Sequence, residues 1–344
     1  MTETMLKHKS ILIGSLKNKQ IDPFREYFLS FHPYEQAQFF VSLEKKDRLT
    51  VYYFLSPVEM AEIFETMDLV ETTDYFKEMD PRYATDILAK LPVDDAVDIL
   101  NTFDKEIVAS FLTIMDDEAA DDIKALLHYE EKTAGSIMTT EYVALQETDT
   151  IRQAMEKLKT MAPDAETIYY LYVLDADGHL VGVLSLRELI IAQDETLIKD
   201  LMNHNVVSVS VGMDQEEIAY IIRDYDFLAA PVVDFQNHLL GIITVDDIID
   251  VIDEEASEDY SKLAGVADDH HPNDTPLQAA KKRLPWLIIL LFLGMFTASL
   301  IGQFEDTIGQ LPLLAMFIPL IAGMAGNTGT QSLAVAVRGL ATGD

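Results

Sequence analysis

The sequence predicts a multidomain protein with three parts: an all-α superhelical N-terminal region, a duplicated α/β module and an α-helical transmembrane segment. Three observations support this prediction. A proline-started helical pattern recurs within the first 130 residues, a strand–turn–strand–helix pattern occurs twice between residues 136 and 255, and two long uncharged apolar runs lie after residue 283. At 344 residues, the chain is long enough for two or three domains.

The N-terminal pattern consists of a proline, acidic residues and then apolar residues at helical spacing. It is found in PVEMAEIFETM from Pro57, PRYATDILAKL from Pro81 and PVDDAVDILNTF from Pro92. Proline and acidic side chains are favoured in the first turn of a helix. Because the pattern recurs roughly every 11–12 residues, it predicts short helices stacked into a superhelix over residues 1–132.

The second repeat has an offset of 59 residues. LYVLDADGHLVGVLSLRELI at 171–190 aligns with APVVDFQNHLLGIITVDDII at 230–249, and Ser185 aligns with Thr244. Each copy shows an apolar strand, a polar turn, a second strand and a Ser or Thr suited to cap a helix. This arrangement is similar to a tandem pair of CBS domains. The resemblance predicts the first CBS domain at residues 133–198 and the second at 199–255.

Two uncharged apolar runs, 284–301 and 311–337, are each long enough for a membrane-spanning helix, which needs roughly 20 apolar residues. Basic residues 281–283 precede the first run and Arg338 follows the second, whereas the connecting segment 302–310 is acidic. Basic flanks stay in the cytoplasm. We therefore expect a multi-pass protein of the plasma membrane with a cytoplasmic N-terminal region. The predicted segments are a connecting helix and linker at 256–283 and transmembrane helices at 284–304 and 310–337.

The charge balance is strongly acidic, with 59 acidic and 25 basic residues and a formal net charge of -34. Such a chain is a poor partner for nucleic acid, whose phosphates require Lys and Arg, but it attracts cations. Asp246, Asp250 and Asp253 recur on one helical face, where like charges repel one another unless a cation neutralises them. The chain has no cysteine, which excludes disulfides and thiolate metal ligands.

The second apolar run also carries polar and small residues. Asn327 and Gln331 are four positions apart and share a helical face. Their neutral oxygens suit contact with a hydrated cation, since Mg²⁺ usually keeps much of its water. The alternative is a polar helix-packing surface. The predicted pore-lining residues are Gly323, Gly326, Asn327, Thr330 and Gln331.

The segment GMAGNTGTQSLAVAVRGLATGD, from Gly323, closely resembles the second transmembrane helix of the MgtE magnesium transporters. The order of the parts also resembles that family: an acidic helical domain, two CBS domains, an acidic connecting helix and membrane helices. The resemblance implies a homodimeric, non-enzymatic Mg²⁺ channel-like transporter that closes when Mg²⁺ binds its cytosolic domains. Family members have five membrane helices, and two are seen here, so we expect this chain to lack the last three and not to conduct alone.

The resemblance also implies a set of Mg²⁺-sensing residues in three regions. In the N-terminal domain they are Glu62, Asp94 and Asp98. In the second CBS domain and the helix that follows it, they are Glu216, the carbonyl of Arg223, Asp226, Asp247 and Asp250, and then Glu255, Glu258 and Asp259 in the connecting helix.

CBS pairs often bind adenine nucleotides, and the family has members that bind ATP. The resemblance implies wall residues Tyr170, Arg187, Phe227 and Pro231, with Glu188 at the position of the ribose-binding acid. Glu188 is longer than the usual Asp, which leaves ATP as an open expectation. The alternative function is a membrane-tethered CBS regulatory module that responds to adenine nucleotide without transport. The chain carries no phosphate-binding glycine loop, HExxH or nucleophile elbow, so we expect no enzymatic activity.

Overall fold

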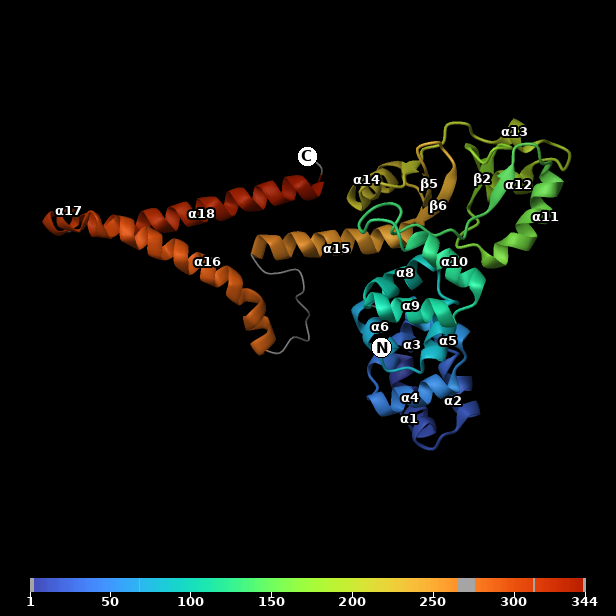
Figure 1. Ribbon diagram of the computed structural model, residues 1–344, viewed down its shortest axis with the longest axis horizontal. Coiled ribbons are helices and arrows are strands. Elements are labelled where there is room, and N and C mark those ends of the chain that lie inside the picture. The colour runs from blue at the N-terminus through green and yellow to red at the C-terminus, as the bar shows by residue number, and fades with distance from the viewer. Residues whose placement is uncertain (1–2, 68, 265–275, 312, 343–344) are drawn as a thin grey trace. The chain divides into compact units, whose positions relative to one another are not determined.

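The computed structural model describes residues 3–67, 69–264, 276–311 and 313–342 (Figure 1). Part of the predicted linker, 265–275, lies outside the described residues. The chain divides into two compact units, Met1–Ile248 and Ile249–Asp344. The first unit holds the helical N-terminal domain and both α/β repeats, and the second holds long helices.

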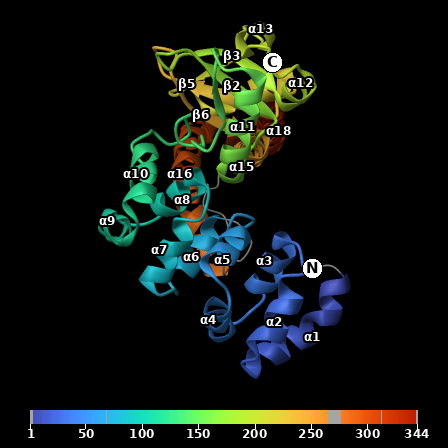
Figure 2. The same cartoon turned by 90° about the vertical axis from the view of Figure 1, so that its right-hand side faces the viewer.

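The N-terminal domain is a stack of short helices (Figure 2). From residue 21 onward each helix begins 12 residues after the one before, at positions 21, 33, 45, 57, 69, 81, 93, 105 and 117. This period confirms the predicted repeat of short helices and extends it to helices that have no initial proline. The helices are α1 (Glu3–Lys17), α2 (Ile21–Phe28), α3 (Pro33–Val41), α4 (Lys45–Phe54), α5 (Pro57–Phe64), α6 (Leu69–Phe76), α7 (Pro81–Leu88), α8 (Val93–Asn101), α9 (Lys105–Ile114) and α10 (Asp117–Leu126).

The helix starts follow local chemistry. Pro57 is the first residue of α5, and Ser56 caps that helix in a capping box with Glu59. Pro81 begins α7 in the same way after the Asp80 cap, but Pro92 is itself the N-cap of α8. The interior of the stack is rich in aromatic side chains, such as the fully buried Phe24, which stacks on Phe28 at 4.9 Å between ring centroids. Burial of these rings holds together helices that would be too short to be stable alone.

The two α/β repeats have the same topology. In each sheet the first strand pairs in parallel with the second, and the second pairs antiparallel with the third, with an irregularity near the end of the second strand. The first repeat contains β1 (Ala144–Gln146), α11 (Ile151–Met161), the 3₁₀ turn η1 (Ala162–Asp164), β2 (Tyr170–Leu174), β3 (Leu180–Ser185) and α12 (Leu186–Ile191). The second contains α13 (Ile198–Leu201), β4 (Val209–Ser210), α14 (Gln215–Tyr225), β5 (Ala229–Val233) and β6 (Leu239–Thr244).

The repeats contact each other through their β-turns and a shared core. The backbone N–H of Leu180 donates to the carbonyl of Asn237 at 2.9 Å, and the rings of His179 and His238 stack at 4.6 Å between centroids. The shared core is an apolar cluster that includes Tyr172 of β2 and Ile242 of β6, which are buried between the sheets. The duplication predicted from the sequence is therefore present as two halves of one α/β module.

The second unit is helical. After α15 (Val245–Ala264), which begins in the first unit, come α16 (Pro276–Gly302), α17 (Glu305–Gln310) and α18 (Leu313–Thr342). Among the described residues, one helical stretch is long and apolar enough to cross a membrane, Ala280–Gly302, with a mean hydropathy of 2.3. The first predicted span, 284–304, overlaps this stretch over residues 284–302. The second lies in α18 and stays a prediction, and the expected connecting loop contains α17.

Candidate functional site

Carboxylates from distant parts of the first unit gather near the start of α15. The group, here called the acidic cluster, affects the pKa values of its own members, which places them within electrostatic reach of one another. They come from the end of α5, from α8, from the segment before β2 and from the first turn of α15. The members are Glu65, Asp94, Asp95, Asp98, Glu166, Asp246 and Asp247.

Asp94 is the most buried carboxylate of the cluster. Asp94 is 8% exposed, and its Oδ1 atom is buried without a hydrogen-bond partner among the described residues. Burial first, and then the charges of Asp247, Asp95 and Glu166, raise the pKa of Asp94 well above its ordinary value. A buried carboxylate is normally paired or metal-bound, because an uncompensated charge in the interior is costly. Oδ1 of Asp94 is therefore an oxygen ligand at a position where a bound cation would offset the free-energy cost of the buried charge.

The other members repeat this pattern at lower burial. Burial and then Asp247 raise the pKa of the half-buried Asp95 to about 8, and the same two causes raise that of Glu166 to about 7. Burial, Glu62 and Asp246 raise the pKa of Glu65. Glu65 and Glu166 are at the exposed rim, where solvent screens their charges. The charges that act on these groups are all negative, so a divalent cation is the chemical species that suits the cluster.

The structure brings together part of the predicted sensor set. Asp94 and Asp98 lie on α8, and Asp247 at the start of α15 acts on the pKa of Asp94. The charge of Glu62 raises the pKa of Glu65. Four members of the cluster were not predicted: Glu65, Asp95, Glu166 and Asp246. The first two and Asp246 are close in sequence to predicted ligands and could have been found from that proximity. Glu166 is distant in sequence from every predicted ligand.

Other predicted ligands of the second repeat lie on and beside α14. In the first turn of α14, Oε1 of Glu216 accepts a hydrogen bond from the Tyr220 hydroxyl at 2.9 Å. Asp226 caps the other end with a left-handed φ of 54°, and its N–H donates to the carbonyl of Arg223 at 3.4 Å. The Arg223 side chain pairs with Asp224. Glu216 and Arg223 are seven positions apart on the helix, roughly 10 Å along its axis, so these groups cannot all bind one ion.

The remaining predicted ligands follow along α15 in the second unit. Asp250 is exposed, and Glu255, Glu258 and Asp259 are partly exposed. Glu258 forms an ion pair with Lys262 at 2.7 Å, which raises the pKa of Lys262. This part of the helix therefore presents carboxylates to solvent.

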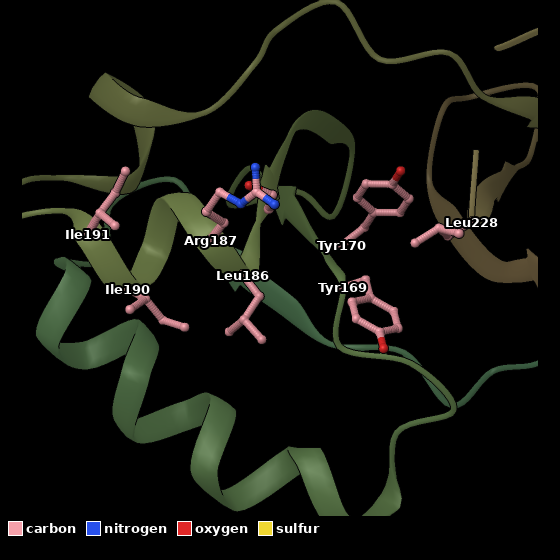
Figure 3. A pocket seen from close by; sticks show the side chains of 8 residues that line it. Tyr169, Tyr170, Leu186, Arg187, Ile190, Ile191 and Leu228 are labelled. Carbon is pink, nitrogen blue, oxygen red and sulfur yellow. The ribbon is translucent and has the colours of Figure 1, made fainter. Parts of the chain in front are cut away.

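A cavity of about 600 Å³ lies beside β2, β3 and α12 (Figure 3). Figure 3 shows Arg187 directed toward Tyr170, with Leu228 from the second repeat beyond it and Tyr169 and Leu186 nearby. The walls are mainly apolar and aromatic, with one guanidinium, a combination that suits a planar apolar group carrying negative charge. The lining residues are Tyr169, Tyr170, Ser185, Leu186, Arg187, Ile190, Ile191 and Leu228.

The predicted nucleotide residues divide between the cavity and its surroundings. Tyr170 and Arg187 line the cavity. Glu188 instead closes a capping box, in which its Oε2 accepts from the N–H and the hydroxyl of Ser185 at 2.9 and 2.7 Å. Phe227 stacks on Tyr225, and Pro231 is buried within β5. Six lining residues were not predicted: Ser185 was recognised only as a helix cap, and the apolar positions carry no signal of their own.

The predicted pore residues all lie on α18. The Thr330 hydroxyl donates to the carbonyl of Gly326 at 3.0 Å, one turn earlier in the same helix. A Cβ added at Gly323 or Gly326 would meet no atom within 4 Å among the described residues outside the helix's own backbone. The small residues therefore leave room for another helix to approach closely.

Comparisons with known proteins agree with this architecture. The profile of the MgtE intracellular N domain matches residues 31–132, and that of the CBS domain matches residues 134–195 and 198–254. The magnesium transporter MgtE of Enterococcus faecalis is 56% identical over 344 residues, which are 99% of this chain and 76% of that protein. The magnesium transporter MgtE of Bacillus subtilis is 48% identical over 67% of this chain and 51% of that protein.

Two solved structures are similar to the first part of the chain. The soluble part of a magnesium transporter has a TM-score of 0.70 and 54% identity, and it covers 73% of this chain and 99% of its own. The cytosolic domain of the Mg²⁺ channel MgtE in complex with ATP has a TM-score of 0.67 and 37% identity, and it covers 71% of this chain and 99% of its own.

A helical stack joined to a CBS pair defines a class of regulatory region rather than an enzyme. The matches specify which one: the chain belongs to the MgtE family of magnesium transporters. The expected family, the helical domain, the tandem CBS domains and the non-enzymatic class are confirmed.

Proposed function

We propose that the acidic cluster is the Mg²⁺ sensor of this transporter and that Mg²⁺ bound there holds the N-terminal domain against the CBS pair. The observation that carries the proposal is the buried Oδ1 of Asp94, which has no hydrogen-bond partner in the described part of the chain and lies within electrostatic reach of Asp95, Glu166 and Asp247. Mg²⁺ would bridge these oxygens, and the compact state would keep the transporter closed. When Mg²⁺ is scarce, repulsion between the carboxylates would separate the domains and favour opening.

The energies are of the right size for such a switch. Two like unit charges about 6 Å apart repel by roughly 3 kcal/mol at an effective dielectric constant of about 20. A site of millimolar affinity supplies about 4 kcal/mol. Removal of a few such repulsions by a weakly bound cation is therefore enough to change which state is populated, provided that the cation binds the compact state better.

Substitution of Asp94→Asn tests the sensor. Because Asn cannot ionise, the substitution should stabilise the metal-free protein by about 1–3 kcal/mol at alkaline pH, where Asp94 is ionised, and it should reduce the stabilisation that Mg²⁺ provides. Thermal unfolding with and without Mg²⁺ measures both effects. Asp86→Asn, on the exposed face of α7, is the matched control and should leave the response to Mg²⁺ unchanged. An equal response to Mg²⁺ in the wild type and Asp94→Asn would contradict the proposal.

The membrane part completes the proposed function. The domain limits and the two spans given above, 284–304 and 310–337, are proposed for a multi-pass protein of the plasma membrane that forms a homodimer. The apolar stretch Ala280–Gly302 supports the first span. The sensor ligands on α14 and α15, including Glu216, Asp226 and Asp250, would bind further Mg²⁺ ions that join the connecting helix to the closed state. Limited proteolysis tests this, since added Mg²⁺ should protect residues 246–260.

We further propose that the cavity beside α12 binds an adenine nucleotide. Arg187 would pair with phosphate, and Tyr169 and Tyr170 would contact the base, in agreement with the ATP complex of the similar cytosolic domain. Because Glu188 is held in its capping box, we expect it to contribute little to ribose binding. This cavity also favours the alternative function, a CBS module that answers to nucleotide without transport.

Calorimetry with ATP separates the two functions. Arg187→Gln should weaken ATP binding about tenfold or more, the usual cost of a lost charged partner. Arg152→Gln, which removes an exposed arginine paired with Glu195, is the control and should bind as the wild type does. Tight ATP binding together with no response to Mg²⁺ would favour the nucleotide module over the transporter sensor.

A further inference from the structure

The chain that leaves the N-terminal domain is hydrogen-bonded to the second CBS repeat, although it leads into the first. The N–H of Ala134 donates to the carbonyl of Met213 at 2.8 Å, and the N–H of Gly135 donates to that of Val211 at 2.9 Å. Just before them, Lys132 has a left-handed φ of 61°, and its carbonyl accepts from the N–H of Gln215 at 3.1 Å. Residues 132–135 are thus fixed to the second repeat, and the domain connection bends where they begin.

A side-chain contact spans this bend. Gly135 is buried, and a Cβ at this position would lie 2.6 Å from both Cγ and Cδ1 of the Tyr129 ring. No real Cβ is accommodated at that distance, so the ring must move if the glycine is replaced. The Tyr129 ring also lies 4.1 Å from the His128 ring between centroids, in a tilted arrangement, which limits where it can go. Tyr129 follows the end of α10, so its ring connects the last helix of the N-terminal domain to the fixed segment.

The angle of α10 is transmitted to the acidic cluster, because α10 packs against α8 and α8 carries Asp94. We infer that the Tyr129–Gly135 contact is a positioning device that sets the angle between the N-terminal domain and the second CBS repeat, and so places Asp94 against Asp247. The inference rests on the proposed Mg²⁺ sensor. Tyr129 and Gly135 would bind no ion themselves, and they act through the residues that do.

The absence of cysteine allows a direct test on the full chain. Lys90→Cys at the end of α7 and Lys199→Cys on α13 place two spin labels at exposed positions, one on each side of the bend. Double electron–electron resonance then measures the distance between them as Mg²⁺ is added. In the wild-type background we expect Mg²⁺ to convert a broad distribution into a narrow one. With Gly135→Ala, the Mg²⁺ concentration at the midpoint of this conversion should rise about fivefold or more, as expected when the ligands meet at the wrong angle.

Two further variants separate positioning from a general loss of stability. Adding Tyr129→Ala to Gly135→Ala makes room for the new methyl group, so the Mg²⁺ midpoint should return most of the way to that of the wild type. Gly212→Ala, where an added Cβ meets nothing within 4 Å, should leave the midpoint unchanged. The inference is wrong if Gly135→Ala titrates as the wild type does, or if the double variant is no closer to it than Gly135→Ala. If Mg²⁺ has no effect on the wild-type distance, the proposed sensor and this inference both fail.

Discussion

At the scale of single residues, the chemistry of the cluster depends on how little solvent reaches Asp94. The same aspartate on an open helix face would be hydrated and would need no ion. In α8 its oxygen is buried while Asp95 and Asp247 act on it with the same sign of charge. The fold therefore holds these carboxylates in a state that costs free energy until a proton or a cation arrives.

The raised pKa values predict how the metal-free protein responds to pH. Asp95 has a pKa of about 8 in the folded protein against an ordinary 3.8, so the folded state binds the proton more tightly than the unfolded state. The stability from this proton is complete below the unfolded pKa and is lost as the pH rises toward 8. We expect the metal-free chain to lose about 1–2 kcal/mol between pH 6 and 9, because partial exposure discounts the full effect.

Chemical denaturation in the presence of a chelator measures this change. Asp95→Asn should flatten the dependence on pH, while Asp86→Asn should not. Saturating Mg²⁺ should also flatten it, since the bound ion replaces the proton. A stability that rises from pH 6 to 9 in the metal-free wild type would contradict the expected direction.

At the scale of elements, the two CBS repeats share one topology but carry opposite charges at the start of the helix that follows the third strand. At the offset of 59 residues, Arg187 at the start of α12 corresponds to Asp246 at the start of α15, and Ile191 corresponds to Asp250. Arg187 lines the cavity, and Asp246 belongs to the acidic cluster. The same helix start thus carries a guanidinium beside a cavity in one repeat and a carboxylate of the acidic cluster in the other.

The glycines of the third strands predict how tightly these elements are packed. At Gly241 in β6, a Cβ would lie 2.6 Å from the backbone oxygen of Thr139, whereas at the equivalent Gly182 in β3 it would meet the flexible side chain of Met202. Backbone cannot move aside as easily as a thioether. Gly241→Ala should cost about 2–4 kcal/mol and Gly182→Ala about half as much. Urea unfolding of the two variants provides the comparison, and an equal loss would show that Met202 is as rigid as the backbone.

Sequence patterns predicted elements better than they predicted the site. Pro57 and Pro81 mark helix starts through local chemistry, so they could be found without a structure. The starts at Ile21 and Lys105 have no proline at the first helical position, and the 12-residue period identifies them. Glu166 reaches the cluster through tertiary folding across 71 residues from Asp95, and no local pattern encodes that approach. In the cavity, the cationic Arg187 could be predicted, while Ile190 could not be distinguished from a core residue.

At the scale of the whole molecule, a net charge of -34 raises the question of whether any salt would serve in place of Mg²⁺. Dissolved ions screen exposed charges over a Debye length of about 8 Å at physiological ionic strength, but they screen buried groups much less. We expect NaCl at the same ionic strength to reproduce only a small part of the Mg²⁺-dependent protection of residues 246–260. Proteolysis rates in the two salts measure this. Equal protection would mean that the response is general screening rather than binding.

The regular helix starts of the N-terminal domain have a consequence for how it comes apart. Each helix rests mainly on its neighbours, so in such a stack stability is approximately a sum of local interfaces. Among the described helices, α1 and α2 lie at one end of the stack, and α8 lies six helices beyond α2. Loss of structure that begins at α1 should therefore reach α8 only after the helices between them have come apart.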